Sequence, residues 1–249
     1  TQILVDASGA AQWTARRLGV AGSKYTSLCY GERLSGCQID EPETFAFLAP
    51  HQRYGSGGGW FYPLEDGAAS FGYSIVVPNT GASATRGNAW RYQAAKREFQ
   101  PYAHQVLGAR VDSIEGGAVP VGRVGRFCDD RILRVGDAAG QANPWSVEGC
   151  RPALENGLLA ARVIQRAFQT RRFDRTTLAA FEEAWRKDNR ERFWRTESAA
   201  DVVWNRPDAA WEKFINWYAS LPPERQYQQL RENHAGVLGQ IYARLGYAR

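Results

Sequence analysis

The sequence predicts an α+β fold in which three regions carry different patterns. An apolar run at residues 132–135 ends in Gly136-Asp137, passes through small residues, and enters a long helical pattern. Short strand patterns separated by turn residues fill residues 25–77, and residues 174–249 read almost entirely as helix. These observations indicate a strand–helix unit, a mixed β-sheet region and a helical C-terminal tail.

The strand–helix unit has the features of a ligand-binding turn. Small residues at 138–140 let a ligand approach the backbone, and the helix start offers unpaired N–H groups to an anion. Asp137, at the end of the strand, is placed to accept hydrogen bonds from ligand hydroxyls. The alternative is an ordinary crossover in which Asp137 only caps the helix. The small residues, the turn at Asn143 and the Glu148-Gly149 pair favour the ligand site.

The other expected elements follow in chain order. Residues 2–5 form a strand, residues 6–9 a turn and residues 10–18 a short helix. The β region holds strands at 26–29, 44–48, 59–62 and 69–76, with a turn at 65–67. A helix at 88–107 and a strand at 110–124, interrupted at Gly116-Gly117, precede the strand at 132, and a helix spans 147–171.

The glycine-rich run at residues 55–59 does not predict a phosphate-binding loop. Such a loop opens a helix, whereas here a strand follows, and the GxGxxG spacing is absent. We expect a hairpin connection instead. In the strand that follows, alternation places Trp60 and Tyr62 on one face and Phe61 on the other. One face must pack in a core, and the other is able to line a broad apolar pocket.

Composition narrows the class of protein. The chain has 249 residues, of which 44% are hydrophobic and 23% charged, as in a globular protein with a real core. The net charge of +5 is spread along the chain, so we expect no nucleic-acid partner. The four cysteines form no CxxC pair and histidine is scarce, so we expect no metal site. The absence of a long apolar run and of a signal pattern predicts a cytoplasmic protein.

Several segments resemble, in order, the FAD-dependent monooxygenase-like oxidoreductases, and in particular their geranylgeranyl reductase branch. Residues 136–161 (GDAAGQANP, EGC, ALENGLLAA) resemble the second flavin-binding motif, with Cys150 where Ile is usual. Residues 3–9 resemble the DASG motif, and residues 59–64 resemble the aromatic strand that borders the substrate cavity. Residues 120–123 resemble the segment that leads into the flavin motif. The helical tail resembles nothing in this family.

The resemblance implies a division of the chain. Residues 1–24 and 120–172 would be the remainder of an FAD-binding domain, residues 25–119 a β-rich substrate domain, and residues 173–249 a helical region. In this family an N-terminal βαβ unit with GxGxxG holds the ADP part of FAD, and here that motif is absent. We therefore expect a fragment, with that unit missing or supplied elsewhere. The alternative is a protein that has lost flavin binding.

The resemblance also assigns residues to FAD and to the substrate. Asp137 would bind the ribityl or pyrophosphate region, and the backbone of residues 148–150 would face the flavin N1–C2=O edge. The full set of expected FAD contacts is Asp6, Ser8, Gly9, Gly136, Asp137, Asn143, Pro144, Glu148, Gly149 and Cys150. Trp60, Tyr62 and Trp145 would line the substrate pocket, and core packing explains each of them about equally well. No acid, base or nucleophile stands out, so the catalytic side chain stays unknown.

The implied function is that of a flavin-dependent oxidoreductase acting on a large apolar, isoprenoid-like substrate. Reduced FAD would deliver hydride to a C=C bond, with NAD(P)H or ferredoxin as electron donor. Alternatives in the same superfamily are a flavin-dependent halogenase, a hydroxylase and a lycopene-cyclase-like enzyme. An alternative of another class is a flavin-free lipid- or partner-binding protein on a degenerate fold.

Aromatic and arginine residues recur at helical spacing in the tail. Examples are Phe181 and Trp185 beside Arg186 and Arg190. We expect these helices to pack on the main domain. The alternative is an interfacial face that makes peripheral membrane contact.

Overall fold

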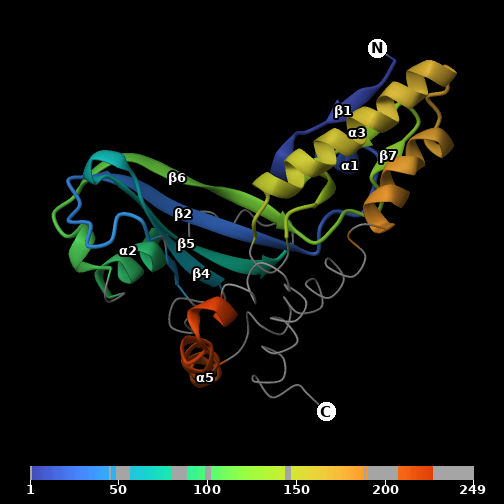
Figure 1. The fold of residues 1–249 in the computed structure, drawn as a ribbon. Helices are drawn as coiled ribbons and strands as arrows, with labels where there is room; N and C mark the ends of the chain where they lie inside the picture. Colours follow the sequence, from blue (N-terminus) through green and yellow to red (C-terminus); the bar gives the residue numbers. More distant parts are fainter. Residues whose placement is uncertain are drawn as a thin grey trace. The chain divides into compact units, whose positions relative to one another are not determined.

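The computed structural model describes residues 2–44, 46–48, 57–79, 89–98, 102–143, 147–187, 189 and 207–226. These residues form helices and two β-sheets (Figure 1), which confirms the α+β class. The chain divides into two compact units. Unit 1 comprises residues 1–26, 119–203 and 219–249, and unit 2 comprises residues 27–118 and 204–218. The predicted division into FAD-binding, substrate and helical regions concerns function and stays a prediction.

Unit 1 is built on a three-stranded sheet in the order β1-β8-β7. The strands are β1 (Leu4–Asp6), β8 (Ile132–Arg134) and β7 (Cys128–Asp129). Strand β1 pairs parallel to β8, and β7 pairs antiparallel to it. The helices are α1 (Trp13–Arg17), α3 (Cys150–Thr170) and an unlabelled one at residues 175–187. Leu133, Phe127 and Phe181 lie in the core of this unit.

The helix at residues 175–187 packs into the core of unit 1. Phe181 and Trp185 are buried, and the Trp185 ring meets the Phe127 ring edge-on with centroids 4.8 Å apart. The expected packing of this helix is therefore confirmed, and these two side chains are unavailable to a membrane. Arg186, on the same helix, pairs with Glu182. The other aromatic and arginine residues of the predicted stripe lie outside the described residues.

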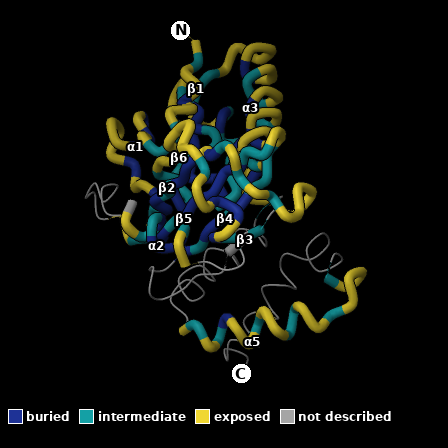
Figure 2. The backbone as a smooth tube through the Cα atoms, turned by 90° about the vertical axis from the view of Figure 1, so that its left-hand side faces the viewer, coloured by how far each residue is buried: buried dark blue, intermediate teal, exposed yellow. Residues whose placement is uncertain are grey.

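Unit 2 is built on a five-stranded sheet in the order β3-β4-β5-β2-β6. The strands are β2 (Tyr25–Ser35), β3 (Ala46–Leu48), β4 (Gly57–Pro63), β5 (Ala69–Pro78) and β6 (Arg110–Val121). Strands β4 and β5 form an antiparallel hairpin in which Trp60 faces Gly72 across the ladder. Figure 2 shows the buried residues gathered on these strands. Helix α2 (Ala89–Glu98) also belongs to this unit, as does most of α5 (Asp208–Ala219).

A buried glutamate fixes α2 to the sheet. Glu32, on β2, accepts hydrogen bonds from Tyr92 Oη at 2.9 Å and Gln93 Nε2 at 3.0 Å, and pairs with Lys96 Nζ at 2.7 Å. Burial raises the pKa of the Tyr92 phenol, and the adjacent carboxylate of Glu32 raises it further. The carboxylate is thus fully satisfied by one helix, as a buried charge requires.

The predicted strands are present, but two glycine segments behave differently from the prediction. Gly57 and Gly58 were expected in a connection before the predicted strand at 59–62, and instead they form the start of β4, paired with β5. A Cβ at Gly57 would lie 1.8 Å from the Ser74 carbonyl oxygen, so glycine permits close strand contact there. Strand β6 runs through Gly116 without the expected interruption, because Gly116 lies directly against the backbone of Cys29.

The predicted helix at 88–107 is wrong in its last part. Helix α2 is described to Glu98, and His104–Val106 form a separate 3-10 turn. Leu107 is extended and Gly108 has a φ of +76°, so the chain leaves helical geometry before the next strand. In the sequence, Pro101 separates the two elements, and proline lacks the N–H that a continuing helix requires.

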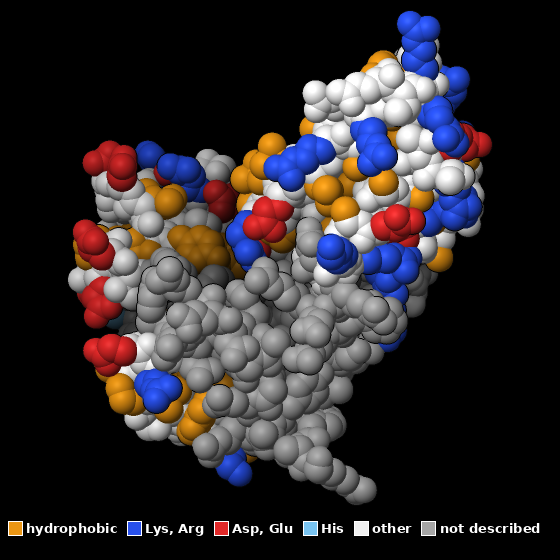
Figure 3. All heavy atoms as spheres, turned by 45° about the vertical axis from the view of Figure 1, so that its right-hand side comes forward, with side chains coloured by type: hydrophobic (Ala, Val, Ile, Leu, Met, Phe, Trp, Pro, Cys, Tyr) orange, Lys and Arg blue, Asp and Glu red, His pale blue; other side chains and the backbone are white. Residues whose placement is uncertain are grey.

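The surface carries mixed charge. Figure 3 shows Lys and Arg side chains interspersed with acidic and apolar ones rather than gathered in one block. Within the described part of the chain, no helix combines the length and the apolar character that a bilayer span needs. The described residues also include no group of three or more His, Cys, Asp or Glu side chains arranged to hold a metal ion.

Candidate functional site

The parallel pairing of β1 with β8 brings the two predicted motif turns together. Asp6 lies opposite Arg134 at the carboxyl ends of these strands. The DASG turn follows β1, and the turn that begins at Gly136 follows β8, so both leave the same edge of the sheet. The carboxyl edge of parallel strands is where ligands bind in open α/β sheets.

Gln12 joins the two turns. Its side chain is buried, and its Nε2 donates to Ser23 Oγ at 2.9 Å and to the Asp137 carbonyl at 3.3 Å. The Gln12 backbone has a φ of +44°, a left-handed conformation that is uncommon outside glycine. Strain of this kind is retained where the surroundings hold the residue in place. Sequence reasoning missed Gln12, because its partners lie up to 125 residues away.

The turn after β8 is tightly built. Residues 136–139 form a 3-10 turn that ends at Gly140, whose φ is +66°. A Cβ at Gly140 would lie 2.3 Å from the Gly122 carbonyl oxygen and 2.6 Å from Ser23 Oγ. Gln141 is buried and accepts from the Gly136 N–H at 2.8 Å, while its Nε2 has no hydrogen-bond partner among the described residues. The described part of the turn therefore leaves one buried donor unsatisfied.

Asp137 lies beside the start of α3. A Cβ at Gly149, the residue before the helix, would lie 3.4 Å from Asp137 Oδ1, so this carboxylate contacts the helix entrance closely. Asp137 Oδ1 and Oδ2 accept no hydrogen bond from the described residues. Burial raises the pKa of Asp137 above the ordinary value for an aspartate. A hydroxyl donor at this carboxylate would lower that pKa again.

The helix begins later than its pattern predicted. We expected it to start at Val147, but Val147 has a φ of +56° and α3 begins at Cys150. The intervening loop closes on itself, since Asn143 N donates to the Glu148 carbonyl and Val147 N donates to the Asn143 carbonyl, both at 2.8 Å. The left-handed backbone of Val147 is incompatible with the predicted helix start, so α3 begins after it.

Glu148 caps the first turn of α3. Its Oε1 accepts from the Arg151 N–H at 2.8 Å, and Pro152 has no N–H to offer. Among the first three residues of α3, an incoming anion would therefore meet the N–H of Cys150. The start of α3 thus offers an anion fewer free backbone N–H groups than the sequence suggested.

The DASG turn is held by its own aspartate. Asp6 is buried and accepts from Ser8 N at 2.9 Å, from Thr14 N at 2.8 Å and from Thr14 Oγ1. Burial alone raises the pKa of Asp6, but these hydrogen bonds outweigh it and hold the pKa below its ordinary value. Ser8 Oγ accepts from Trp13 N at 3.0 Å, and Gly9 has a φ of +63°. Asp6 and Ser8 therefore cap α1, and an additional contact of theirs with FAD stays a prediction.

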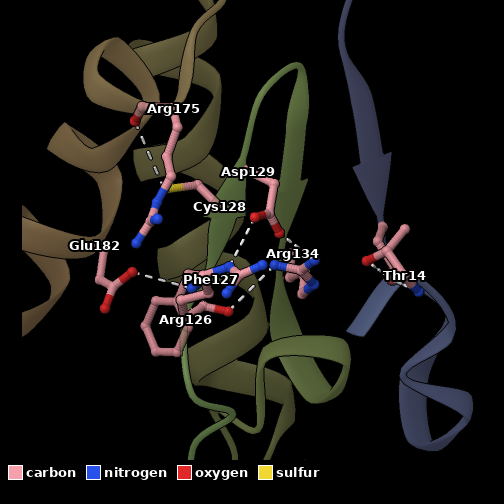
Figure 4. Close-up of polar contacts among 9 residues, drawn as sticks. Thr14, Arg126, Phe127, Cys128, Asp129, Arg134, Arg175 and Glu182 are labelled. Carbon is pink, nitrogen blue, oxygen red and sulfur yellow. Dashed lines mark hydrogen bonds and ion pairs between the residues drawn. The ribbon is translucent and has the colours of Figure 1, made fainter. Parts of the chain in front are cut away.

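A buried ion pair lies behind the β8 turn (Figure 4). The Arg134 side chain is fully buried, and its Nη2 lies 2.6 Å from Asp129 Oδ2. Arg126 Nε binds the other oxygen of Asp129 at 2.7 Å, and the Arg126 carbonyl accepts from Arg134 Nη1 at 3.3 Å. Phe127 N donates to Glu182 at 3.0 Å. The network ties β7, β8 and the helix at 175–187 together.

Two of the three aromatic residues predicted for the substrate pocket, Trp60 and Tyr62, lie on one face of the unit 2 sheet. Phe61 is buried in the core, whereas Trp60 and Tyr62 alternate to the opposite face, as the pattern predicted. Burial raises the pKa of the Tyr62 phenol. Trp145, like Pro144, lies outside the described residues. A pocket lined by these residues stays a prediction.

The known proteins that this chain is similar to include several digeranylgeranylglycerophospholipid reductases. No family model matches the chain. The chain is 29% identical over 191 residues to digeranylgeranylglycerophospholipid reductase 2 of Methanothermobacter thermautotrophicus, covering 74% of this chain and 46% of that protein. The chain therefore spans about half the length of the curated relatives it matches.

Solved structures share the fold. A geranylgeranyl bacteriochlorophyll reductase-like protein of Thermoplasma acidophilum superposes with a TM-score of 0.79 at 16% identity, covering 98% of this chain and 62% of that one. The flavin-dependent brominase Bmp2 superposes with a TM-score of 0.60 at 18% identity, covering 100% of this chain and 58% of that one. The predicted resemblance to the geranylgeranyl reductase branch of the FAD-dependent oxidoreductases is confirmed, as is its fold class.

Proposed function

We propose that the protein is an FAD-dependent oxidoreductase that reduces a carbon–carbon double bond of a large, isoprenoid-like substrate. The observation that carries the proposal is the half-buried Asp137 carboxylate at the start of α3, on the carboxyl edge of two parallel strands, which accepts no hydrogen bond from the described residues. The reductases among the relatives support the choice of reaction. The likeness to the brominase is one of fold and gives no reason to prefer halogenation.

The residues around Asp137 fit a flavin nucleotide. A carboxylate with no hydrogen-bond donor among the described residues suits ribityl hydroxyls, and the Cys150 N–H at the helix start suits an electron-rich ring edge or an anion. Gly149 leaves room beside Asp137, and the unsatisfied Nε2 of Gln141 is a further buried donor at this turn. When bound, FAD supplies the two-electron reducing chemistry that no side chain of the chain provides.

The described residues do the work of binding and orientation. Asp137 would accept from a ligand hydroxyl, while Gln12 keeps the two turns at a constant separation. Trp60 and Tyr62 would present ring faces to an apolar chain. The electron donor, NAD(P)H or ferredoxin, belongs to the proposal and is not specified by these residues.

Replacing Asp137 with asparagine is expected to weaken FAD binding about 10-fold or more, because a charged acceptor for a ligand hydroxyl is lost. FAD is titrated against the product of the natural gene and followed by flavin absorbance and fluorescence. Glu155→Gln is the matched control, because Glu155 is exposed on α3 and pairs with Arg151 at 3.6 Å. A colourless wild-type protein that takes up no FAD would instead favour a flavin-free binding protein.

The pH dependence of binding follows from the raised pKa of Asp137. The ligand hydroxyl donates to the ionised form, so FAD affinity should rise as the pH rises through this pKa and should stay flat in Asp137→Asn. The buried charge also destabilises the ligand-free fold above the ordinary aspartate pKa, increasingly as the pH rises through the raised value. Asp137→Asn should therefore be more stable than wild type at neutral pH and equal to it in acid.

We further propose that the protein is cytoplasmic and contacts membranes peripherally, because isoprenoid chains reside in membranes. The helical tail would make that contact through residues other than the buried Phe181 and Trp185. Co-sedimentation with vesicles containing anionic lipid is expected, and should weaken with added salt. If the protein stays in the supernatant at low salt, the membrane part of the proposal fails and the reductase part stands.

A further inference from the structure

The indole ring of Trp60 packs against two glycines, Gly31 and Gly72. A Cβ at Gly72 would lie 2.1 Å from Trp60 Cζ2, and a Cβ at Gly31 would lie 3.0 Å from the same atom. Gly72 lies on β5 directly opposite Trp60, and Gly31 lies on β2. The ring therefore occupies the space that side chains at both positions would fill, on the face of the sheet opposite the core.

A directed chain of hydrogen bonds holds the polar end of this indole. Trp60 Nε1 donates to Ser70 Oγ at 3.1 Å, and Ser70 Oγ donates to Glu115 Oε2 at 2.7 Å. The three residues come from β4, β5 and β6, so Glu115 reaches across β2 to contact Ser70. Ser70 is buried, and Trp60 and Glu115 are half-buried.

The chain of hydrogen bonds has a chemical consequence for the exposed part of the ring. An indole N–H left without a partner beside an apolar ligand would cost free energy, because it could not be solvated. Here Ser70 Oγ accepts a hydrogen bond from that N–H, and the Ser70 hydroxyl donates a hydrogen bond to the Glu115 carboxylate. The exposed part of the Trp60 ring is therefore apolar, and its N–H is already hydrogen-bonded. Packing against Gly31 and Gly72 holds the ring in one orientation.

We propose that Glu115, acting through Ser70, is a positioning residue that holds Trp60 as a rigid apolar wall for the isoprenoid chain of the substrate. The inference rests on the proposed reductase function for the identity of the chain. It does not depend on the flavin site, since every residue involved lies in unit 2. Gly31, Gly72 and Ser70 thereby become determinants of which apolar chains fit.

The first test detects the hydrogen bonds without any substrate. In ¹H–¹⁵N spectra of the natural protein, the Trp60 indole signal is identified by its loss in Trp60→Phe. Ser70→Ala and Glu115→Ala should move this signal upfield, because the hydrogen bond is lost or weakened. Ser70→Thr keeps the hydroxyl and Glu115→Gln keeps an acceptor, so both should remain close to wild type. These two conservative variants also serve if an alanine variant fails to fold.

The second test measures binding of geranylgeraniol. Glu115→Ala is expected to raise its dissociation constant roughly 3- to 10-fold, the range of one hydrogen bond. In Trp60→Phe, where no N–H exists, the same change should add nothing. Ser74→Ala is the matched control, because Ser74 lies on the same face of β5 and donates to the Gly58 carbonyl instead.

The outcomes separate this inference from the proposed function. An unchanged Trp60 indole signal in Ser70→Ala and Glu115→Ala would refute the chain of hydrogen bonds from Trp60 through Ser70 to Glu115. A moved signal with unchanged geranylgeraniol binding would refute the role as a substrate wall while leaving the reductase proposal intact. If the wild-type protein neither binds geranylgeraniol nor reduces an isoprenoid double bond, both proposals fail.

Discussion

Asp129→Ala is expected to lower the free energy of unfolding by about 3–5 kcal/mol, one of the two largest losses that we predict for a single substitution in unit 1. Asp129 is the counter-ion of Arg134, whose side chain has no exposure to water. Its removal leaves a guanidinium charge in the interior. Among the described residues, that guanidinium keeps one carbonyl contact at 3.3 Å, and its Nε already has no partner. The cost arises mainly from the stranded charge rather than from the lost attraction.

Urea unfolding followed by circular dichroism measures this loss, with two companion variants. Arg126→Ala removes the other, partly exposed partner of Asp129 and should cost less than about 1 kcal/mol. Asp129→Leu combined with Arg134→Met replaces the pair with apolar side chains and should recover most of the stability. Equal losses in Asp129→Ala and Arg126→Ala would show that burial of the Arg134 charge does not determine the effect.

Arg134 also shows where sequence reasoning stops. A charged residue in a short strand is normally read as facing solvent, and only the pairing with Asp129 on the neighbouring strand lets it be buried. The strand itself, its Gly-Asp turn and the following helix were predictable, because period and turn chemistry are local. Gln12 and Ser23 could not be predicted as partners of that turn, since the parallel register of β1 and β8 brings them there.

The prediction of the first residue of α3 was wrong for a related reason. The helical pattern extends back to Val147, but hydrogen bonds between Asn143 and residues 147 and 148 close the loop and hold Val147 in a left-handed conformation. The sequence pattern reports the propensity of these residues for a helix. It does not report that hydrogen bonds with Asn143 compete with helix formation at residues 147 and 148. The face assignment of Trp60 succeeded because strand alternation is local, whereas its link to Glu115 spans four neighbouring strands, from β4 to β6, and was not foreseen.

Gly140→Ala should destabilise unit 1 by about 2–5 kcal/mol and strongly reduce FAD uptake. An alanine at a φ of +66° costs about 1–2 kcal/mol by itself. Its Cβ would also lie 2.3 Å from the backbone oxygen of Gly122, which cannot move as a flexible side chain can. Relief of that clash must displace either the β8 turn or the segment at Gly122, and overpacking of this kind adds a further 1–3 kcal/mol.

Gly157→Ala separates this argument from a general effect of replacing glycine. Gly157 lies inside α3, where an added Cβ meets nothing within 4 Å, so alanine should stabilise the protein by roughly 0.5–1 kcal/mol. Gly140→Ala also displaces Ser23, the partner of Gln12, so it should loosen the link between the DASG turn and the Asp137 turn. Thermal unfolding and FAD titration of both variants measure the two effects. If Gly140→Ala keeps wild-type stability and flavin affinity, the close contact at Gly122 does not define the site, and the geometry proposed for Asp137 loses its support.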